Sequence, residues 1–410
     1  MKVLVLLSRF PWPLDKGDKL RAYHQLRYLA GRGHELCVLA LSDQPVTAEA
    51  LSAVRPLCRG GLHLHRLGRA GRGRGLARAL VTGGRPLQVG YFYEAGAQAL
   101  VNSLLRDFQP DHVYCQLIRM AEYLRPHAGR GPALTLDYMD VFSAGMARRS
   151  ATAPAWQRPV LALEARRLRV YEAEVYAWFG QHTIISSQDQ TLLPLPEAER
   201  AAVQVVPNGI DFDYFLPQPQ APIAHELLFC GNMAYAPNVD AAHWLVEEIL
   251  PLVRQQHPAA RLLIAGTSPT RRVRALARRL GVQVSGWLPD LRPAYAGAQV
   301  FVAPMRMGTG LQNKLLEAMA MARPCVTTSL ANNALQASPG EHLRVADSAP
   351  ALAAAITELL HDPATATRLG AAGHAFVRQH YAWDSATARL EALWAPTPEA
   401  ARLNQVDQGG

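Results

Sequence analysis

Short apolar runs alternate with longer helical patterns along most of the chain, and this alternation limits the fold more than any other feature. Residues 3–7 form a continuous apolar run, as expected of a strand that is covered on both faces. A helical pattern over 20–30 follows, ends at a glycine-containing turn, and is succeeded by a second apolar run at 36–41. Strand–helix–strand units of this kind build parallel sheets covered by helices. The sequence therefore predicts an α/β protein.

The alternation occurs in two series, separated by a stretch rich in Pro and Gln. Further strands of the first series are expected at 112–117, 133–137, 182–186 and 203–206. In the second series they are expected at 227–230, 261–265, 282–285, 300–303 and 324–327. We expect two Rossmann-like, doubly wound parallel-sheet domains that face each other across a cleft, with ligands outside the carboxyl ends of the strands.

The predicted domain organisation has five parts. Residues 1–215 form an N-terminal domain, and residues 216–225 form a linker. Residues 226–383 form a C-terminal domain. Residues 384–394 form a helix that packs back toward the N-terminal domain, and the small, polar residues of 395–410 form a disordered tail.

Composition excludes several classes of protein. The 410 residues suffice for two domains, and 49% hydrophobic with 18% charged residues is typical of globular proteins. No apolar run reaches the length of a membrane span, and the N-terminal run is too short for a signal peptide, so we expect a cytoplasmic protein. The net charge of +9 favours anionic partners, namely nucleotides, lipid phosphates, phospholipid headgroups or nucleic acid. The five cysteines are scattered without a CxxC motif, which predicts buried thiols, and no metal-ligand spacing is present.

A glycine-rich strand-to-helix turn in the second series contains the most chemistry. Gly308 and Gly310 would let a ligand approach the backbone closely, and a helical pattern begins at Leu311. Free N–H groups at the start of a helix suit a phosphate. If the ligand is a nucleoside diphosphate, Lys314 would face its diphosphate. Glu317, one turn further on, would accept hydrogen bonds from its ribose. The alternative is that Lys314 and Glu317 form a surface i,i+3 pair.

Several segments of the second half, in the same order, resemble the nucleotide-binding domain of family 4 glycosyltransferases, which have the two-domain GT-B architecture. The matching segments are VVPNGIDFDYF, LLFCGNMAYAPN, ARLLIAGTSP, VSGWLPDLRPAYAGAQVFVAPM and GTGLQNKLLEAMAMARPCV. In the first half, SRFPWPLDKGDKLRAYHQLRYLAGRGHEL, LDYMDVFS and SSQDQTLL are similar to a sugar transferase subgroup associated with bacterial exopolysaccharide and PEP-CTERM/exosortase systems.

The resemblance implies a retaining hexosyltransferase that needs neither metal nor cofactor. It would move a sugar from a UDP- or GDP-linked donor to a saccharide acceptor, lipid-linked and at the inner face of the plasma membrane. The resemblance also implies that residues 1–215 form the acceptor-side domain and residues 226–383 the nucleotide-sugar-binding domain. Glu317 matches the second Glu of the family's E-x7-E motif, which holds the donor ribose, while Thr309 stands where the first Glu is expected. The family's basic diphosphate clamp is absent, and Gly231, Asn232 and Met233 stand there instead, which leaves more of the phosphate charge to Lys314 and the helix start.

The first half supplies the remaining candidates. Gly17 would let its loop pass close to the donor phosphates. Asp140, which follows a predicted strand, would contact the acceptor hydroxyl or the transferred sugar, or else cap a helix. The acceptor side is predicted to contain Lys16, Asp18, Lys19, Arg21 and His24. For the last three, the alternative is the solvated face of the first helix.

Taken together, the predicted catalytic residues are Asp140, Lys314 and Glu317. The predicted donor-binding residues are Gly17, Asn232, Gly308, Thr309, Gly310, Leu311, Lys314 and Glu317. The arginine-rich segment 66–78 is expected to be a flexible loop that leans on anionic lipid or is merely solvated.

Three other functions stay open. They are a non-catalytic nucleotide-binding partner protein of the GT-B fold, a sugar-nucleotide epimerase, and a nucleic-acid-binding protein. The last is disfavoured, because no aromatic residues are interleaved with the arginines.

Overall fold

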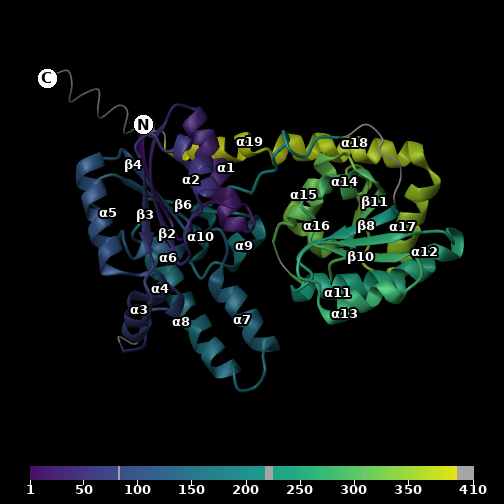
Figure 1. Cartoon of the computed structure of the whole chain (residues 1–410), viewed down its shortest axis with the longest axis horizontal. Helices are drawn as coiled ribbons and strands as arrows, with labels where there is room; N and C mark the ends of the chain where they lie inside the picture. The colour runs from purple at the N-terminus through teal and green to yellow at the C-terminus, as the bar shows by residue number, and fades with distance from the viewer. Residues whose placement is uncertain (82–83, 218–224, 309, 395–410) are drawn as a thin grey trace. The chain divides into compact units, whose positions relative to one another are not determined.

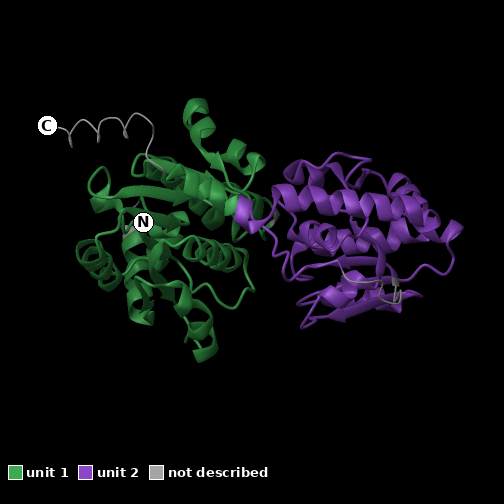
Figure 2. Ribbon diagram, turned by 90° about the horizontal axis from the view of Figure 1, so that it is seen from above, with its two compact units in different colours: residues 1–207, 386–410 green, residues 208–385 purple. Residues whose placement is uncertain are grey.

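A computed structural model describes residues 1–81, 84–217, 225–308 and 310–394, which form two compact units (Figures 1 and 2). The first unit comprises Met1–Pro207 together with the segment from Ala386 onward, and the second comprises Asn208–Ser385. Each unit has a parallel sheet with helices on both of its faces (Figure 1). The parallel α/β class predicted from the alternation is therefore confirmed.

The first unit has a seven-stranded sheet in the order β3-β2-β1-β4-β5-β6-β7. Its strands are β1 (Lys2–Leu7), β2 (Glu35–Ser42), β3 (Gly61–Arg66), β4 (His112–Gln116), β5 (Ala133–Asp137), β6 (Gln181–Ile184) and β7 (Gln204–Val205). Its helices are α1 (Gly17–Gly31), α2 (Ala48–Val54), η1 (Arg55–Leu57), α3 (Arg69–Val81), α4 (Leu87–Phe92), α5 (Ala95–Phe108), α6 (Ile118–Ala121), η2 (Arg125–His127), α7 (Phe142–Thr152), α8 (Arg158–Tyr176), α9 (Ser187–Leu192) and α10 (Glu197–Ala202).

The second unit has a six-stranded sheet in the order β10-β9-β8-β11-β12-β13, the Rossmann order. Its strands are β8 (His225–Cys230), β9 (Leu262–Ala265), β10 (Val282–Gly286), β11 (Ala298–Ala303), β12 (Cys325–Thr327) and β13 (Arg344–Val345). Its helices are α11 (Ala236–Trp244), η3 (Leu245–Ile249), α12 (Leu250–Gln256), α13 (Arg271–Ala275), η4 (Leu276–Arg278), α14 (Arg292–Ala296), α15 (Asn313–Ala320), α16 (Ser329–Leu335), α17 (Ala349–His361) and α18 (Pro363–His380); α19 (Trp383–Leu393) runs from this unit into the first.

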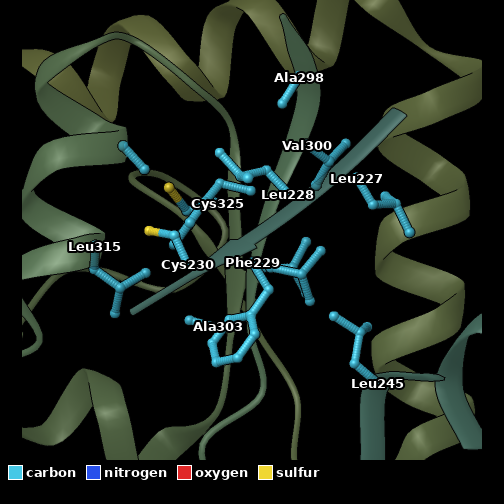
Figure 3. Packing of buried hydrophobic residues seen from close by; sticks show 14 of the residues in the cluster. Leu227, Leu228, Phe229, Cys230, Leu245, Ala298, Val300, Ala303, Leu315 and Cys325 are labelled. Atoms are coloured by element: carbon cyan, nitrogen blue, oxygen red, sulfur yellow. The ribbon is translucent and has the colours of Figure 1, made fainter. Parts of the chain in front are cut away.

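The central strands are apolar on both faces because helices cover both sides of each sheet. In β1, Leu4 and Leu6 pack into one hydrophobic cluster, whereas Val3, Val5 and Leu7 pack into another on the opposite face. The second unit is built in the same way. Figure 3 shows the side chains of β8 between Leu315 of α15 on one side and Leu245 on the other.

The last described helix, α19, ends in the core of the first unit. Leu390 and Trp394 are buried there, and the Trp394 ring stacks on His112 at a centroid distance of 4.7 Å. The Trp394 indole N–H also donates a hydrogen bond to the Thr135 hydroxyl at 3.1 Å. The C-terminal end of the described chain thus completes the fold of the N-terminal unit.

The boundary between the units differs from the expected position. The second unit begins at Asn208, because the segment that follows packs on its core: Ile210 is buried there, and its N–H donates to the Tyr381 carbonyl at 2.7 Å. Phe212 and Phe215 pack against the same core. Most of the expected linker and the whole expected tail lie outside the described residues.

The arginine-rich segment after β3 was expected to be a loop, and this expectation is wrong. It forms helix α3, in which a Cβ on Gly75 would lie 2.0 Å from the Gly90 carbonyl oxygen of α4. The glycine therefore permits close packing of α3 on α4 and does not indicate a flexible chain. Strands β3 and β13 were not expected, because β3 is flanked by glycines and polar residues and β13 has only two residues.

Among the described residues, no helix combines the length and the apolar composition that a membrane crossing requires. All five cysteines are buried and unpaired, as their scattered spacing predicts.

We predict that Trp394→Ala lowers the free energy of unfolding by about 3–5 kcal/mol, because it removes a buried aromatic side chain and leaves a cavity. Equilibrium denaturation in urea, followed by circular dichroism, measures this loss. Trp156→Ala is the matched control: its side chain is 78% exposed, so the change is expected to stay within about 0.5 kcal/mol. Equal losses in the two variants would contradict the packing of α19 described above.

Candidate functional site

The candidate site of the second unit lies where its sheet changes direction. Strands β8 and β11 are neighbours, and the strands that follow them in sequence continue outward on opposite sides. The chain leaves β8 at Gly231 and leaves β11 at Pro304. Such switch points leave the carboxyl ends of two adjacent strands open to a ligand.

Helix α15 presents its N-terminus at this edge. Gln312 precedes the helix, and its side chain makes no capping hydrogen bond, so the side chain leaves the first N–H groups of the helix uncovered. Leu315, Leu316 and Met319 are buried in the core and hold the helix in place. An uncapped N-terminus on an anchored helix is suited to an anion.

Lys314 lies in the first turn of α15, and its side chain is held by neutral groups. Its Nζ donates to the Asn238 Oδ1 at 2.6 Å and to the Gln312 Oε1 at 3.3 Å, and it lies 5.4 Å from the centre of the Phe229 ring. Burial lowers the pKa of Lys314 to about 8, although Cys230 and Glu317 raise it. Binding of an anion would favour the charged ammonium at this position.

Glu317 lies on the same side of α15, beside a buried tyrosine. The Tyr295 hydroxyl donates to the Glu317 Oε2 at 2.7 Å, and the Cys230 Sγ lies 2.9 Å from the same hydroxyl. Burial raises the pKa of Glu317 to about 7, although the Tyr295 hydrogen bond and the charge of Lys314 lower it. Tyr295 fixes one carboxyl oxygen, and no residue in the described part of the chain donates a hydrogen bond to the other, Oε1.

Two glycines bring the backbone of neighbouring strand ends together. A Cβ on Gly266, after β9, would lie 1.8 Å from the Gly231 carbonyl oxygen. A Cβ on Gly231 would lie 2.7 Å from the Asn238 Nδ2 and 3.4 Å from the Lys314 Cε. Both glycines have positive φ angles, of 135° and 152°, that other residues rarely adopt. They therefore allow Asn238 and Lys314 to meet beside the strand ends.

The other predicted donor residues surround this group. The Asn232 carbonyl accepts a hydrogen bond from the Asn238 Nδ2 at 2.9 Å, so Asn232 positions the partner of Lys314. Gly308 and Gly310 both have a φ of 95°, and Leu311 packs against the core. Thr309 lies outside the described residues.

In the first unit, the candidate side chains gather at the carboxyl ends of β1, β4 and β5. The Arg9 Nη1 donates to the Asp18 Oδ2 at 2.6 Å. Burial and the charge of Arg9 lower the pKa of Arg119 to about 10, while Asp18 and Asp140 raise it. Asp140 is exposed and precedes Val141, which occupies the N-cap position of α7 without a side-chain capping hydrogen bond. Asp140 is therefore not the N-cap residue of that helix. This cluster of two arginines and two aspartates offers both hydrogen-bond donors and acceptors, which suits the hydroxyls of a sugar.

Two predicted acceptor-side residues are inside the unit, which is a correction. Arg21 is fully buried: its Nε donates to the Asp137 Oδ2 at 2.6 Å, and its Nη1 donates to the Pro207 carbonyl at 3.2 Å. His24 is only 5% exposed. The Arg21 side chain points toward the sheet from α1 and His24 is buried, so neither lies on the exposed surface of the unit.

The remaining three predictions in this region fall on the surface. Lys16 and Gly17 are exposed at the start of α1, and a Cβ on Gly17 would meet no atom of the described residues within 4 Å. Lys19 is partly exposed, and its Nζ donates to the Asp15 Oδ1 at 2.8 Å.

Sequence reasoning missed Tyr295, Cys230, Arg9 and Arg119 as parts of these groups. The position of three of them relative to a strand end could have indicated them, since Cys230 ends β8, Arg9 follows β1 and Arg119 follows β4. Tyr295 had no such signal, because it reaches Glu317 from the buried face of α14.

Comparisons with known proteins concern the sequence family and the fold. Residues 224–362 match the family described as Glycosyl transferases group 1. The chain is 29% identical over 231 residues to the GDP-mannose-dependent alpha-(1-6)-phosphatidylinositol monomannoside mannosyltransferase of Mycobacterium tuberculosis. That alignment covers 51% of this chain and 60% of the mannosyltransferase. The family match therefore lies within the second unit, and the alignment spans less than two thirds of the mannosyltransferase.

Solved structures extend the likeness to both units. Sucrose-phosphate synthase from Thermosynechococcus elongatus has a TM-score of 0.67 at 16% identity, with 96% of this chain and 98% of that chain covered. HepE from Anabaena, in complex with UDP-glucose, has a TM-score of 0.65 at 12% identity, with 96% and 100% covered. These similarities establish that the chain has the GT-B fold.

We predict that Arg21→Met lowers the free energy of unfolding by about 3–5 kcal/mol, because it leaves the buried Asp137 carboxylate without its ionic partner. Urea denaturation of the whole chain measures the change. The control is Lys19→Met, whose partly exposed pair with Asp15 is expected to contribute about 1 kcal/mol or less. A loss for Arg21→Met no larger than for the control would show that the burial of this pair does not stabilise the unit.

Proposed function

We propose, from the group 1 glycosyltransferase match within the second unit, that this chain is a retaining hexosyltransferase. It transfers a sugar from a nucleoside-diphosphate donor to a saccharide acceptor. The observation that carries the proposal is the position of Lys314 and Glu317 on one anchored helix whose uncapped N-terminus lies at the sheet's switch point. This arrangement supplies a cation, N–H donors and a carboxylate within one turn of helix.

The proposed roles follow from the surroundings of each residue. Lys314 and the N–H groups of α15 stabilise the charge that develops on the leaving diphosphate. Glu317 accepts hydrogen bonds from the donor ribose through Oε1, while Tyr295 holds Oε2. Asn238 holds the Lys314 ammonium at the strand ends by a hydrogen bond. When the donor binds, the phosphate replaces some or all of this hydrogen bond. Asp140, on the first unit, is proposed to contact the acceptor hydroxyl.

The donor and acceptor are proposed from the relatives. The Mycobacterium tuberculosis relative is named for GDP-mannose and a phosphatidylinositol mannoside, and the HepE structure contains UDP-glucose. We therefore propose a UDP- or GDP-linked donor and a lipid-linked saccharide acceptor. The resemblance of residues 8–36, which include α1, further supports a role in bacterial exopolysaccharide synthesis, at the inner face of the plasma membrane.

We predict that UDP or GDP binds the purified protein and that Glu317→Ala weakens the binding at least about tenfold, since a hydrogen-bonded carboxylate contributes roughly 1.5–3 kcal/mol. Isothermal titration with UDP, GDP and ADP measures the effect. Glu247→Ala, an exposed carboxylate of the same unit, is the matched control and is expected to bind like the wild type. Binding of no nucleotide by well-folded protein, or equal binding by Glu317→Ala, would overturn the donor-site assignment.

Turnover assays then separate the functions. A transferase releases nucleoside diphosphate and forms a glycoside whose anomeric configuration, measured by NMR, matches that of the donor. An epimerase would convert the sugar without an acceptor, and a non-catalytic partner protein would bind nucleotide without turnover. Inversion at the anomeric carbon would overturn the retaining assignment.

We also predict that nucleotide affinity is greatest between about pH 7 and 8. Below pH 7 Glu317 becomes protonated and accepts hydrogen bonds less well, and above pH 8 Lys314 loses the charge that binds phosphate. Above pH 8 the affinity is expected to fall by about tenfold per pH unit. Titrations across this range check the profile: Glu317→Gln should remove the rise near pH 7, and Lys314→Met should remove the fall above pH 8. An unchanged profile in both variants would contradict these roles.

A further inference from the structure

Helices α7 and α8 form a hairpin that extends from the first unit, with the turn at its tip (Figure 1). Large apolar side chains are exposed along it. They are Trp156 (78% exposed), Val160 (59%), Leu163 (48%) and Val170 (60%). Isolated apolar side chains are common on protein surfaces, but a cluster on one hairpin indicates a surface that something covers.

Three of these apolar residues, Val160, Leu163 and Val170, lie along one side of α8. Together with Arg167 they are spaced by three, four and three residues, which is the helical spacing of one side. The residues with which α8 faces the core, such as Leu168, are a different set. The exposed stripe therefore does not belong to the packing that holds the helix in the unit.

The charge around the stripe is predominantly positive. Residues 142–171 contain six arginines and one acidic residue, Glu164. Glu164 is buried, and its carboxylate accepts hydrogen bonds from the Leu87 N–H at 2.9 Å and the Gln88 N–H at 3.1 Å. On the exposed surface of residues 142–171 the charge is consequently positive, with Arg166 and Arg169 exposed next to the stripe. Glu174, four residues beyond Val170 on α8, is also exposed and forms an ion pair with Arg85 at 2.9 Å.

We propose that the α7–α8 hairpin docks on the surface of a lipid bilayer that contains anionic lipids. The apolar stripe would enter the boundary between headgroups and acyl chains, with Trp156 at the depth that tryptophan prefers. The arginines keep their guanidinium groups among the anionic headgroups while their stems lie along the apolar stripe. Helix α3, with exposed Arg69, Arg74 and Arg78, extends in the same direction in Figure 1 and adds positive charge on that side.

A bilayer suits this surface better than a protein partner does. The apolar residues project from a protruding hairpin, whereas the anchor residues of protein interfaces commonly fill pockets in a complementary partner. Predominantly positive charge also matches a broad anionic surface without requiring any particular pattern of acidic residues. The proposal goes beyond the proposed function and does not rest on it, because docking is measured without nucleotide or acceptor.

The test is co-sedimentation of the full chain with vesicles of phosphatidylcholine alone, and with vesicles in which about a third of the lipid is phosphatidylglycerol. We expect binding to the anionic vesicles that weakens as salt is raised. The double variant Trp156→Ser/Leu163→Ser is expected to lose at least about tenfold in vesicle affinity through its apolar area. Arg166→Ser/Arg169→Ser is expected to lose about 25-fold, at roughly fivefold per arginine.

The matched control is Arg274→Ser/Leu280→Ser. It removes an exposed arginine and an exposed leucine from the arginine-rich residues 271–280 of the second unit. It is expected to bind vesicles like the wild type. Thermal unfolding and UDP or GDP titration of every variant show that the fold and the donor site are intact, so docking and the proposed function can fail separately. Equal vesicle binding by wild type and hairpin variants would overturn the proposal. The proposal would also be overturned if the wild-type protein did not bind anionic vesicles. The same holds if the hairpin variants changed only the oligomeric state.

Discussion

The parallel arrangement of strands is the constraint on which the rest of the structure depends. Each strand must be followed by a crossover before the next strand can pair with it in the same direction, and each crossover needs helices that cover a face of the sheet. The strands are therefore buried on both sides, which explains apolar runs such as those of β1 and β8. The same constraint places the carboxyl ends of all strands at one edge of each sheet. The polar groups of both candidate sites lie at such edges because the core excludes them.

The candidate donor site combines low polarity with two opposite charges. Burial alone would neutralise both Lys314 and Glu317, and their pKa values move toward neutrality for that reason. Neutral partners, Asn238 for the ammonium and Tyr295 for the carboxyl group, keep the side chains in place without a direct ion pair between them. Both charged groups therefore stay available to a ligand that bears phosphate and hydroxyl groups.

The first unit shows the opposite use of charge. Arg21 and Asp137 are buried together, and Tyr114 and the Pro207 carbonyl satisfy more of their hydrogen-bonding groups. This network joins α1, the middle of β4, the end of β5, and the last residue before the second unit. It connects elements of the sheet, while Arg9, Asp18, Arg119 and Asp140 are charged groups at the edge itself. The exposed arginines of α7 and α8 form a third group, and the exposed acidic residue of α8, Glu174, pairs with Arg85.

The sequence by itself determined the class of fold, the two series of strands and helices, and the glycine-rich turn before α15. These features follow from local periodicity and from residue types, which act over a few neighbouring positions. It also indicated Lys314 and Glu317, because residues three apart on a helix lie on the same side. The tertiary structure alone decided that Arg21 and His24 are buried, that α3 is a helix packed through Gly75, and that Tyr295 and Asn238 hold the two charged residues. Those outcomes depend on contacts between segments far apart in the chain, as Asn238 and Lys314 are, and no local pattern encodes such distances.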